Sequence, residues 1–468
     1  MHDNVLWFTS TPLPEYLREA LARGELSRAE ILIKNALASS TGLQKLRLEF
    51  ELDRISRWRL EFPYTLKEAY EVLKKDVPDL KLEEMGELLA KGCIDSTVID
   101  DEPRVLKRFA ANAFWLCPDL KARRRRIVDE RDRVARLALK SRAELVVNRG
   151  RSVGGGHVLP LQYRVRATLR LRKGAVPCGE EVRVWIPLPR VSGLHPEVRI
   201  LRAEPKPKRI AAEDHQQRTV YFELPSEDGE VCCTLEYEFI SRGFHVDVDP
   251  RNTGVDEGSD VYVEYTRERV PHMVFTPYLK ELASRIVGDE KNPYFKVKRI
   301  WDWITRNIRY TYARDYALYD CIAEYVARER RGDCGMQAIL FITLCRIAGV
   351  PARWESGWYM NPIRHGMHDW AQFYIEPYGW LYADPSFGSF RHGEEWRNSF
   401  YLGSIEGYRL ASNIEVSTPF DPPKTHFRSD PVDSQRGEVE WSGGNLYYDK
   451  WDFDLEIMSV ENLEADLE

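Results

Sequence analysis

The sequence lacks the long apolar runs, dense cysteines and excess of one charge that mark several classes of protein. No apolar run approaches the roughly 18–20 residues that a bilayer span requires. Eight cysteines in 468 residues are too few for a disulfide scaffold, and no C-x-x-C pair of zinc-ribbon type occurs. With 68 Lys and Arg against 74 Asp and Glu, the net charge of −6 gives no general attraction for nucleic acid.

The first residues also lack the basic-then-apolar ramp of a signal peptide, because an acid already stands at Asp3. Most of the cysteines are expected to be buried thiols, which favours a reducing compartment. The sequence therefore leads us to expect a cytoplasmic location.

What remains is an ordinary globular composition. Hydrophobic residues make up 43% and charged residues 30%, which is enough for a core. The 29 glycines and 26 prolines are too few for a collagen-like or low-complexity chain. The length is about three times the usual domain of roughly 150 residues, so two to four domains are expected.

Residues 1–150 are predicted to form a helical N-terminal domain, because apolar residues recur there at helical spacing. Thr65 is expected to begin a helix as its N-cap, and Glu68 completes a capping box. The stretch 121–142 holds ten basic and three acidic residues, including Arg123–Arg126. It could bind an anionic partner such as nucleic acid. Because no aromatic residues are interleaved, a solvated helix face is the favoured interpretation.

A second domain is predicted over 157–268, after the glycine run 154–156. There the apolar pattern changes to a period of two in several short segments, which indicates an antiparallel β-sandwich. No cluster of acids, bases or nucleophiles falls in it. The acidic loop 247–254 superficially resembles a calcium loop, but Arg251 occupies a ligand position.

Helices return in a third domain, 269–425, and an acidic C-terminal segment follows at 426–468. Residues 430–468 include twelve acids and two bases. This segment could dock on the basic residues Arg123–Arg126, or it could be a solvated tail.

The third domain contains the residues whose side chains could take part in a reaction. The first is a cysteine at a predicted helix start. Asp333 is a natural N-cap, and Gly349 and Pro351 end the helix. Cys334 would then lie in the first turn, where unpaired N–H groups and the helix dipole favour a thiolate. Cys345 lies three turns further along and is expected to be an inert core thiol.

A base for this thiol is expected on the strands that follow. His368 opens one predicted strand and Asp384 closes the next, so a hairpin would place the imidazole beside the carboxylate. His365 and His368 form an H-x-x-H pair, but no third ligand is suitably spaced. We therefore expect no metal and no other cofactor.

Together these segments resemble the transglutaminase-like superfamily of papain-related Cys-His-Asp enzymes. The resemblance covers roughly 279–390 and rests on the following residues: Gly332-Asp333-Cys334-Gly335, the run 346–353, His368-Asp369-Trp370, the stretch from Gly379 to Ser386, and the upstream element 304–310. It implies an α+β fold with a papain-like transglutaminase core, in which a cysteine-bearing helix packs on an antiparallel sheet. A β-sandwich and an N-terminal helical region precede this core.

The resemblance also implies an activity. Cys334, His368 and Asp384 would be the catalytic residues of a cysteine peptidase, amidase or acyltransferase that works on an amide through a thioester, with hydrolysis favoured over cross-linking. Tyr310 is the first candidate for an auxiliary oxyanion donor. Trp358 and Trp370 are candidates for walls of the substrate cleft, with packing in the core of the hairpin as the alternative. The expected partner is a protein, peptide or glycopeptide substrate.

Two alternatives remain from the sequence. The core could be a catalytically silent binding protein for peptides or glycans. Alternatively, the basic residues Arg123–Arg126 could drive binding to an anion or nucleic acid. The oligomeric state is not readable from the sequence.

Overall fold

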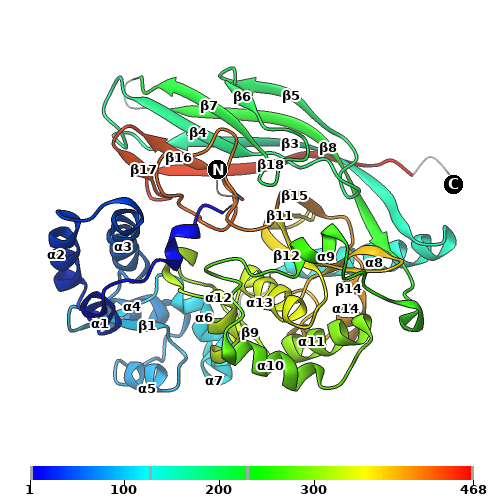
Figure 1. Cartoon of the computed structure of the whole chain (residues 1–468), viewed down its shortest axis with the longest axis horizontal. Helices are drawn as coiled ribbons and strands as arrows, with labels where there is room; N and C mark the ends of the chain where they lie inside the picture. The colour runs from blue at the N-terminus through cyan, green and yellow to red at the C-terminus, as the bar shows by residue number, and fades with distance from the viewer. Residues whose placement is uncertain (1–3, 126–128, 228–230, 465–468) are drawn as a thin grey trace.

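The computed structural model describes residues 4–125, 129–227 and 231–464 and shows an α+β protein with three parts (Figure 1). A helical N-terminal part lies beside a mixed core, and two antiparallel sheets extend over both. None of the helices in the described ranges is long and apolar enough to cross a membrane.

Most helices of the N-terminal part pack around an apolar cluster of their own, whereas α8 packs on β3 (Gly156–Leu171) and β8 (Cys232–His245) and adds Ala143 and Val146 to the cluster of the core. The elements of the N-terminal part are η1 (Trp7–Ser10), α1 (Glu15–Ala22), α2 (Leu26–Leu37), α3 (Gly42–Glu61), α4 (Leu66–Asp76), α5 (Glu84–Ala90), β1 (Ser96–Ile99), β2 (Glu102–Val105), α6 (Phe109–Leu116), α7 (Pro118–Arg123) and α8 (Glu130–Ser152). The capping box at the start of α4 is confirmed: the Glu68 N–H donates to the Thr65 hydroxyl, and the Thr65 N–H donates to the Glu68 carboxylate.

The basic stretch is divided between α7 and α8. Arg123 pairs with Asp79 and Glu84, and Arg124 with Asp76. These guanidinium groups therefore have carboxylate partners within the N-terminal part. Arg126 lies outside the described residues.

The β-sandwich consists of two antiparallel sheets. Its elements before the core are β3 (Gly156–Leu171), β4 (Glu181–Pro187), β5 (Val198–Glu204), β6 (Arg209–Ile210), β7 (Thr219–Pro225), β8 (Cys232–His245) and η2 (Pro250–Asn252). One sheet has the order β17-β16-β4-β7-β6 and the other β18-β3-β8-β5.

The acidic C-terminal segment supplies strands to both sheets, namely β16 (Glu438–Trp441), β17 (Gly444–Leu446) and β18 (Trp451–Asn462). β16 pairs with β4, and β18 runs along nearly the whole of β3. The segment that we treated as separate from the sandwich therefore completes it, as the red strands in Figure 1 show. Acids of β18 pair with arginines of β3, as Glu456 does with Arg166 at 3.1 Å, which accounts for the alternating charge.

The core places helices against a five-stranded antiparallel sheet of order β14-β13-β12-β11-β15. Its helices are α9 (Asp260–Tyr265), α10 (Pro277–Val287), α11 (Pro293–Asn307), η3 (Tyr316–Leu318), α12 (Ile322–Glu329), α13 (Cys334–Ile347), η4 (Phe390–His392) and α14 (Glu395–Phe400). Its strands are β9 (Arg309–Tyr310), β10 (Arg331–Gly332), β11 (Ala352–Met360), β12 (His365–Ile375), β13 (Gly379–Ala383), β14 (Leu402–Gly403) and β15 (Arg409–Ile414).

Helix α13 lies at the centre of the core, and every residue from Cys334 to Arg346 is buried. It packs on β12 and β11 on one side and on α11 and α12 on the other, for example through Phe341 against Phe373 and Trp301. A helix that is apolar all round has no solvent face. Its position on the sheet is therefore fixed by packing.

The cysteines differ in part from the expectation of buried thiols. Cys93 and Cys117 form a disulfide in the N-terminal part, and Cys178 and Cys232 are exposed. Cys345 is buried in the core, as predicted.

The three parts meet at Arg57 of α3, whose side chain is 1% exposed. Its guanidinium pairs with Asp53 at 2.7 Å and with Asp315 at 3.1 Å, and donates to the carbonyls of Arg428 and Ser429. Arg57→Ala is expected to lower the free energy of unfolding by about 3–5 kcal/mol, because it leaves buried carboxylates and carbonyls without a partner. Urea unfolding measures this loss.

Arg59→Ala on the same helix is the matched control, because the half-exposed Arg59 contacts only Glu30 and the Ser27 hydroxyl among the described residues. It is expected to change the free energy of unfolding by less than about 1 kcal/mol. Equal effects of the two substitutions would contradict the linking role of Arg57.

Candidate active site

Cys334 occupies the first turn of α13, where the sequence places it. The Asp333 carboxylate caps the helix by accepting the Met336 N–H at 3.0 Å, and it also accepts the Tyr316 hydroxyl at 2.5 Å. Cys334 is 9% exposed and lines a cavity of about 200 Å³, called here the cysteine cavity. The thiol is therefore fixed at a helix N-terminus and still faces an opening.

The neighbour of the sulfur is Asp369 on β12. The Cys334 thiol donates to Asp369 Oδ2 at 3.3 Å, and the Asp369 peptide N–H donates to the sulfur. Burial, with the negative charges of Asp369 and Asp333, raises the pKa of the Cys334 thiol well above its usual value. The predicted thiolate is therefore wrong for this state: burial and two acids outweigh the helix dipole.

The Asp369 carboxyl is itself buried, and its pKa is shifted upward. Burial raises its pKa well above the usual value, and the charges of Asp433 and Asp333 add to the rise. Asp433 has a pKa raised to about 6, mainly by burial. Gln435 donates to Asp369 Oδ1 at 2.6 Å and so fixes the orientation of the carboxyl. The carboxyl beside the sulfur thus has a raised pKa and a fixed orientation.

His368 and Asp384 lie together as the sequence predicts. His368 Nε2 is 2.6 Å from Asp384 Oδ2, and Arg409 Nη1 donates to the same oxygen at 2.9 Å. Burial would raise the pKa of Asp384, but the charges of His368 and Arg409 hold it below its usual value. Glu406 balances Arg409 through two hydrogen bonds. The imidazole is therefore oriented by an ionised carboxylate.

Cys334 and His368 are adjacent in the fold but share no hydrogen bond in the described part of the chain. Successive residues of a strand point to opposite faces, so Asp369 takes the side facing α13 while His368 turns to the other. The link between them is the peptide N–H of Asp369, which contacts the sulfur. The Nδ1 atom of His368 makes no hydrogen bond within the described ranges.

Tyr310 is placed at the cysteine cavity, as the sequence suggests. The parallel pair β9–β10 sets Tyr310 beside Gly332, two residues before Cys334. Burial raises the pKa of the Tyr310 hydroxyl, and the nearby Cys334 adds to the rise, so it stays protonated as a donor. The role of Tyr310 as an oxyanion donor stays a prediction.

The two tryptophans lie elsewhere than at the cleft wall. Trp370 is fully buried, stacks on His368 and donates to Glu355 at 2.6 Å. Trp358 donates to the Gln435 carbonyl and packs toward the sandwich. Neither lines the cysteine cavity. Trp370 therefore supports the imidazole, and the tyrosines 310, 312 and 316 form the aromatic wall.

Sequence reasoning missed the groups that surround the predicted residues. Asp369 directly follows His368, so the strand alternation could have placed it on the side facing the helix. Arg409, Asp433 and Gln435 come from later segments, and no local pattern marks them. Among the described residues no group of three or more His, Cys, Asp or Glu is arranged to hold a metal ion.

Gly335 allows these groups to meet. A Cβ at this position would lie 2.6 Å from Asp369 Oδ2 and would overlap the Tyr316 hydroxyl. Gly335→Ala is expected to cost about 1–3 kcal/mol of stability, because the core would be overpacked. Gly366→Ala on β12, where a Cβ meets nothing within 4 Å, should be nearly neutral. Thermal unfolding compares the two, and similar losses would contradict the tight contact.

Asp369 also sets the ionisation of the thiol. Because a carboxylate beside the sulfur disfavours the thiolate, Asp369→Asn is expected to lower the pKa of the Cys334 thiol. The pH at which iodoacetamide alkylates Cys334 at half its maximal rate should therefore be lower in the variant. Peptide mass spectrometry resolves Cys334 from the exposed Cys178 and Cys232, which serve as internal references. An unchanged half-point would show that Asp369 does not control the thiol.

Comparison with solved structures finds likenesses of low identity. One is to a protein from Cytophaga hutchinsonii provisionally described as a cysteine protease, with 15% identity, a TM-score of 0.40, and coverage of 65% of this chain and 93% of that one. Another is to the periplasmic domain of TgpA from Pseudomonas aeruginosa bound to ethylmercury, with 18% identity, a TM-score of 0.26, and coverage of 55% and 96%.

Two curated proteins are similar over about a quarter of the chain. The uncharacterized protein YebA of Bacillus subtilis is 23% identical over 129 residues, which are 24% of this chain and 17% of YebA. An uncharacterized protein of Haemophilus influenzae is 25% identical over 151 residues, 26% of this chain and 40% of that protein. The chain thus spans less than half the length of either relative. Residues 280–385, which contain Cys334, His368 and Asp384, match the sequence model of the transglutaminase-like superfamily. This segment is a transglutaminase-like core.

Proposed function

We propose that this protein is a cysteine enzyme that cleaves or transfers an amide through a thioester on Cys334, with water as the favoured acceptor. One observation carries the proposal: the sulfur at the N-terminus of α13 contacts the peptide N–H that follows His368, whose ring is 2.6 Å from Asp384. A nucleophile, a base and an orienting acid thus belong to one short stretch of the fold.

The reaction begins from a neutral thiol. The Cys334 proton passes to His368 Nδ1 as the sulfur attacks the amide carbonyl, and a C–S bond forms. His368 then donates this proton to the departing nitrogen as the C–N bond breaks, which leaves a thioester. Water adds to the thioester with His368 as base, releasing a carboxylic acid and the thiol. The net reaction consumes one amide and one water.

Each neighbouring group has a place in this sequence. Asp384 and Arg409 keep the imidazole oriented through its Nε2, which leaves Nδ1 for the sulfur. The Cys334 backbone N–H at the helix start and the protonated Tyr310 hydroxyl are the candidate donors to the oxyanion. Asp369 holds the resting thiol on the α13 side of β12 while His368 faces the other side, so the proton transfer requires the sulfur to leave Asp369 and the imidazole to turn toward it.

The second candidate is a catalytically silent binding protein with the same fold. The observation that favours it is the partner of the sulfur, which is a carboxyl group that raises the thiol pKa. A thiol held in this way throughout the catalytic cycle would not attack an amide.

Incubation with pooled peptides, glycopeptides and amine donors, followed by intact-mass analysis, tests the proposal. Wild type should form a Cys334 adduct, whereas Cys334→Ala should form none. Cys345→Ala on the same helix is the matched control and should retain the adduct, because its thiol is buried in the core. Adducts on both cysteine variants, or on none of the three proteins, would refute a Cys334 thioester.

His368→Gln should slow adduct formation by about 100-fold or more, because general-base catalysis contributes about that much. His365→Gln on the same strand should leave the rate nearly unchanged, because His365 is engaged elsewhere, with Nε2 on the Leu455 carbonyl and its ring beside Trp358. Equal rates for the two variants would favour the silent protein.

A further inference from the structure

Three arginines around the cysteine cavity, Arg108, Arg314 and Arg436, have no carboxylate partner in the described part of the chain. Each lies over aromatic rings instead. The Arg108 guanidinium is 4.9 Å from the ring centre of Tyr312, and that of Arg436 is 3.6 Å from Tyr448. Most arginines of this protein form ion pairs, so three unpaired ones at one cavity are an unusual concentration of charge.

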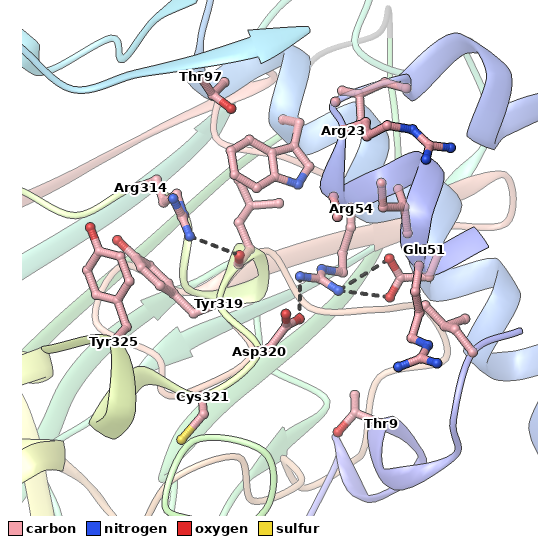
Figure 2. A pocket seen from close by; sticks show the side chains of 18 of the residues that line it. Thr9, Arg23, Glu51, Arg54, Thr97, Arg314, Tyr319, Asp320, Cys321 and Tyr325 are labelled. Atoms are coloured by element: carbon pink, nitrogen blue, oxygen red, sulfur yellow. Dashed lines mark hydrogen bonds and ion pairs between the residues drawn. The ribbon is translucent and has the colours of Figure 1, made fainter. Parts of the chain in front are cut away.

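Arg314 is the most constrained of the three. Its guanidinium lies within 4.3 to 5.3 Å of the ring centres of Trp58, Tyr319 and Tyr325. Its one hydrogen bond within the described ranges goes from Nη2 to the Leu318 carbonyl at 3.5 Å, and its Nε is buried without a partner. Figure 2 shows Arg314 beside Tyr319 and Tyr325. Stacking leaves the edge of the guanidinium available to a planar anion.

Arg314 also lines a second and larger space between the N-terminal helices and the core. This interdomain cavity has a volume of about 990 Å³ (Figure 2). Its charged lining consists of six arginines, Arg18, Arg23, Arg47, Arg54, Arg314 and Arg328, and three acids, Glu51, Asp320 and Glu324. Arg314 therefore lines both cavities.

The acids of the cysteine cavity do not cancel this positive charge. Glu61 pairs with Lys107, and Asp315 pairs with Arg57. Burial raises the pKa of Asp369 well above its usual value, and burial with the charge of Asp433 raises that of Asp430 to about 8. Asp433, with a pKa of about 6, accepts the Ser356 hydroxyl. Asp333 is engaged by Tyr316 and by the helix that it caps.

We propose that the cysteine cavity and the interdomain cavity together bind a peptide segment with carboxylate side chains, and that Arg108, Arg314 and Arg436 recognise those carboxylates. The inference rests on the proposed function, since the bound segment would carry the amide to Cys334. Apolar walls from Leu13, Leu21, Leu26 and Leu318 suit the rest of a peptide chain. The substrate class is therefore an acidic peptide.

Calorimetry on the full chain with Cys334→Ala measures recognition without chemistry. The probes are acetylated and amidated octapeptides that alternate Gly with Glu, Gln or Lys. The Glu peptide is expected to bind at least about tenfold more tightly than the Gln peptide, because charge-assisted contacts to Arg are lost with Gln. Its affinity should fall as salt is raised. Equal binding of the Glu and Gln peptides, or no binding of any of them, would overturn the inference.

Single variants then locate the site. Each of the variants Arg108→Gln, Arg314→Gln and Arg436→Gln is expected to weaken binding of the Glu peptide by about tenfold. Arg172→Gln is the matched control, since Arg172 is an exposed arginine of the sandwich paired with Asp452. Thermal unfolding of each variant shows that the fold is kept. If all three variants bound the Glu peptide with wild-type affinity, the assignment would be overturned. It would also be overturned if citrate competed for the site as strongly as the Glu peptide does.

The inference and the proposed function fail in different ways. A wild-type protein that forms Cys334 adducts equally with acidic and neutral peptides would refute the arginine site and leave the thioester intact. Binding of the Glu peptide without any adduct would support the arginine site and favour the silent binding protein.

Discussion

The site depends on the burial of α13 against β12. A helix with no solvent face can occupy only one position on the sheet, and its N-terminus therefore meets the strand at a fixed point. That point is the peptide between His368 and Asp369, so the thiol is held beside both residues. Gly335 permits the approach, because any side chain there would strike Asp369 and Tyr316. The chemistry thus follows from packing.

Around this contact the structure keeps two kinds of carboxyl group apart. Asp384 is ionised, because the charges of His368 and Arg409 compensate for its burial, and Glu406 balances Arg409 in turn. At Asp369, burial and the charges of Asp433 and Asp333 instead raise the pKa well above its usual value. One acid therefore orients the imidazole, and the other holds the resting thiol in its neutral form. Because successive side chains of β12 point to opposite faces, His368 and Asp369 lie in these two environments although they are neighbours in the sequence.

The sequence was sufficient for local features of the core. Asp333 before a helical run, Gly349 after it, and His368 and Asp384 on paired strands are signals carried by short stretches, and the family resemblance reinforced them. The sequence could not place Arg409, Gln435 or the strands of the C-terminal segment, because these contacts join residues that are far apart in the chain. The ionisation of Cys334 was missed for the same reason: the helix dipole is local, whereas burial and the charge of Asp369 arise only on folding.

The N-terminal helical part, which had no predicted role, forms one side of the site. Asn112 accepts the Tyr312 N–H and donates to the Tyr312 carbonyl, and Glu61 accepts the Asp315 N–H. These contacts hold the segment from Tyr310 to Tyr316, which walls the cysteine cavity and carries Arg314. Because Arg57 binds the far side of the same segment to the C-terminal residues, the wall cannot move independently of either part. The helical part is therefore a structural component of the site, and its arginine-lined cavity extends the surface that surrounds Cys334.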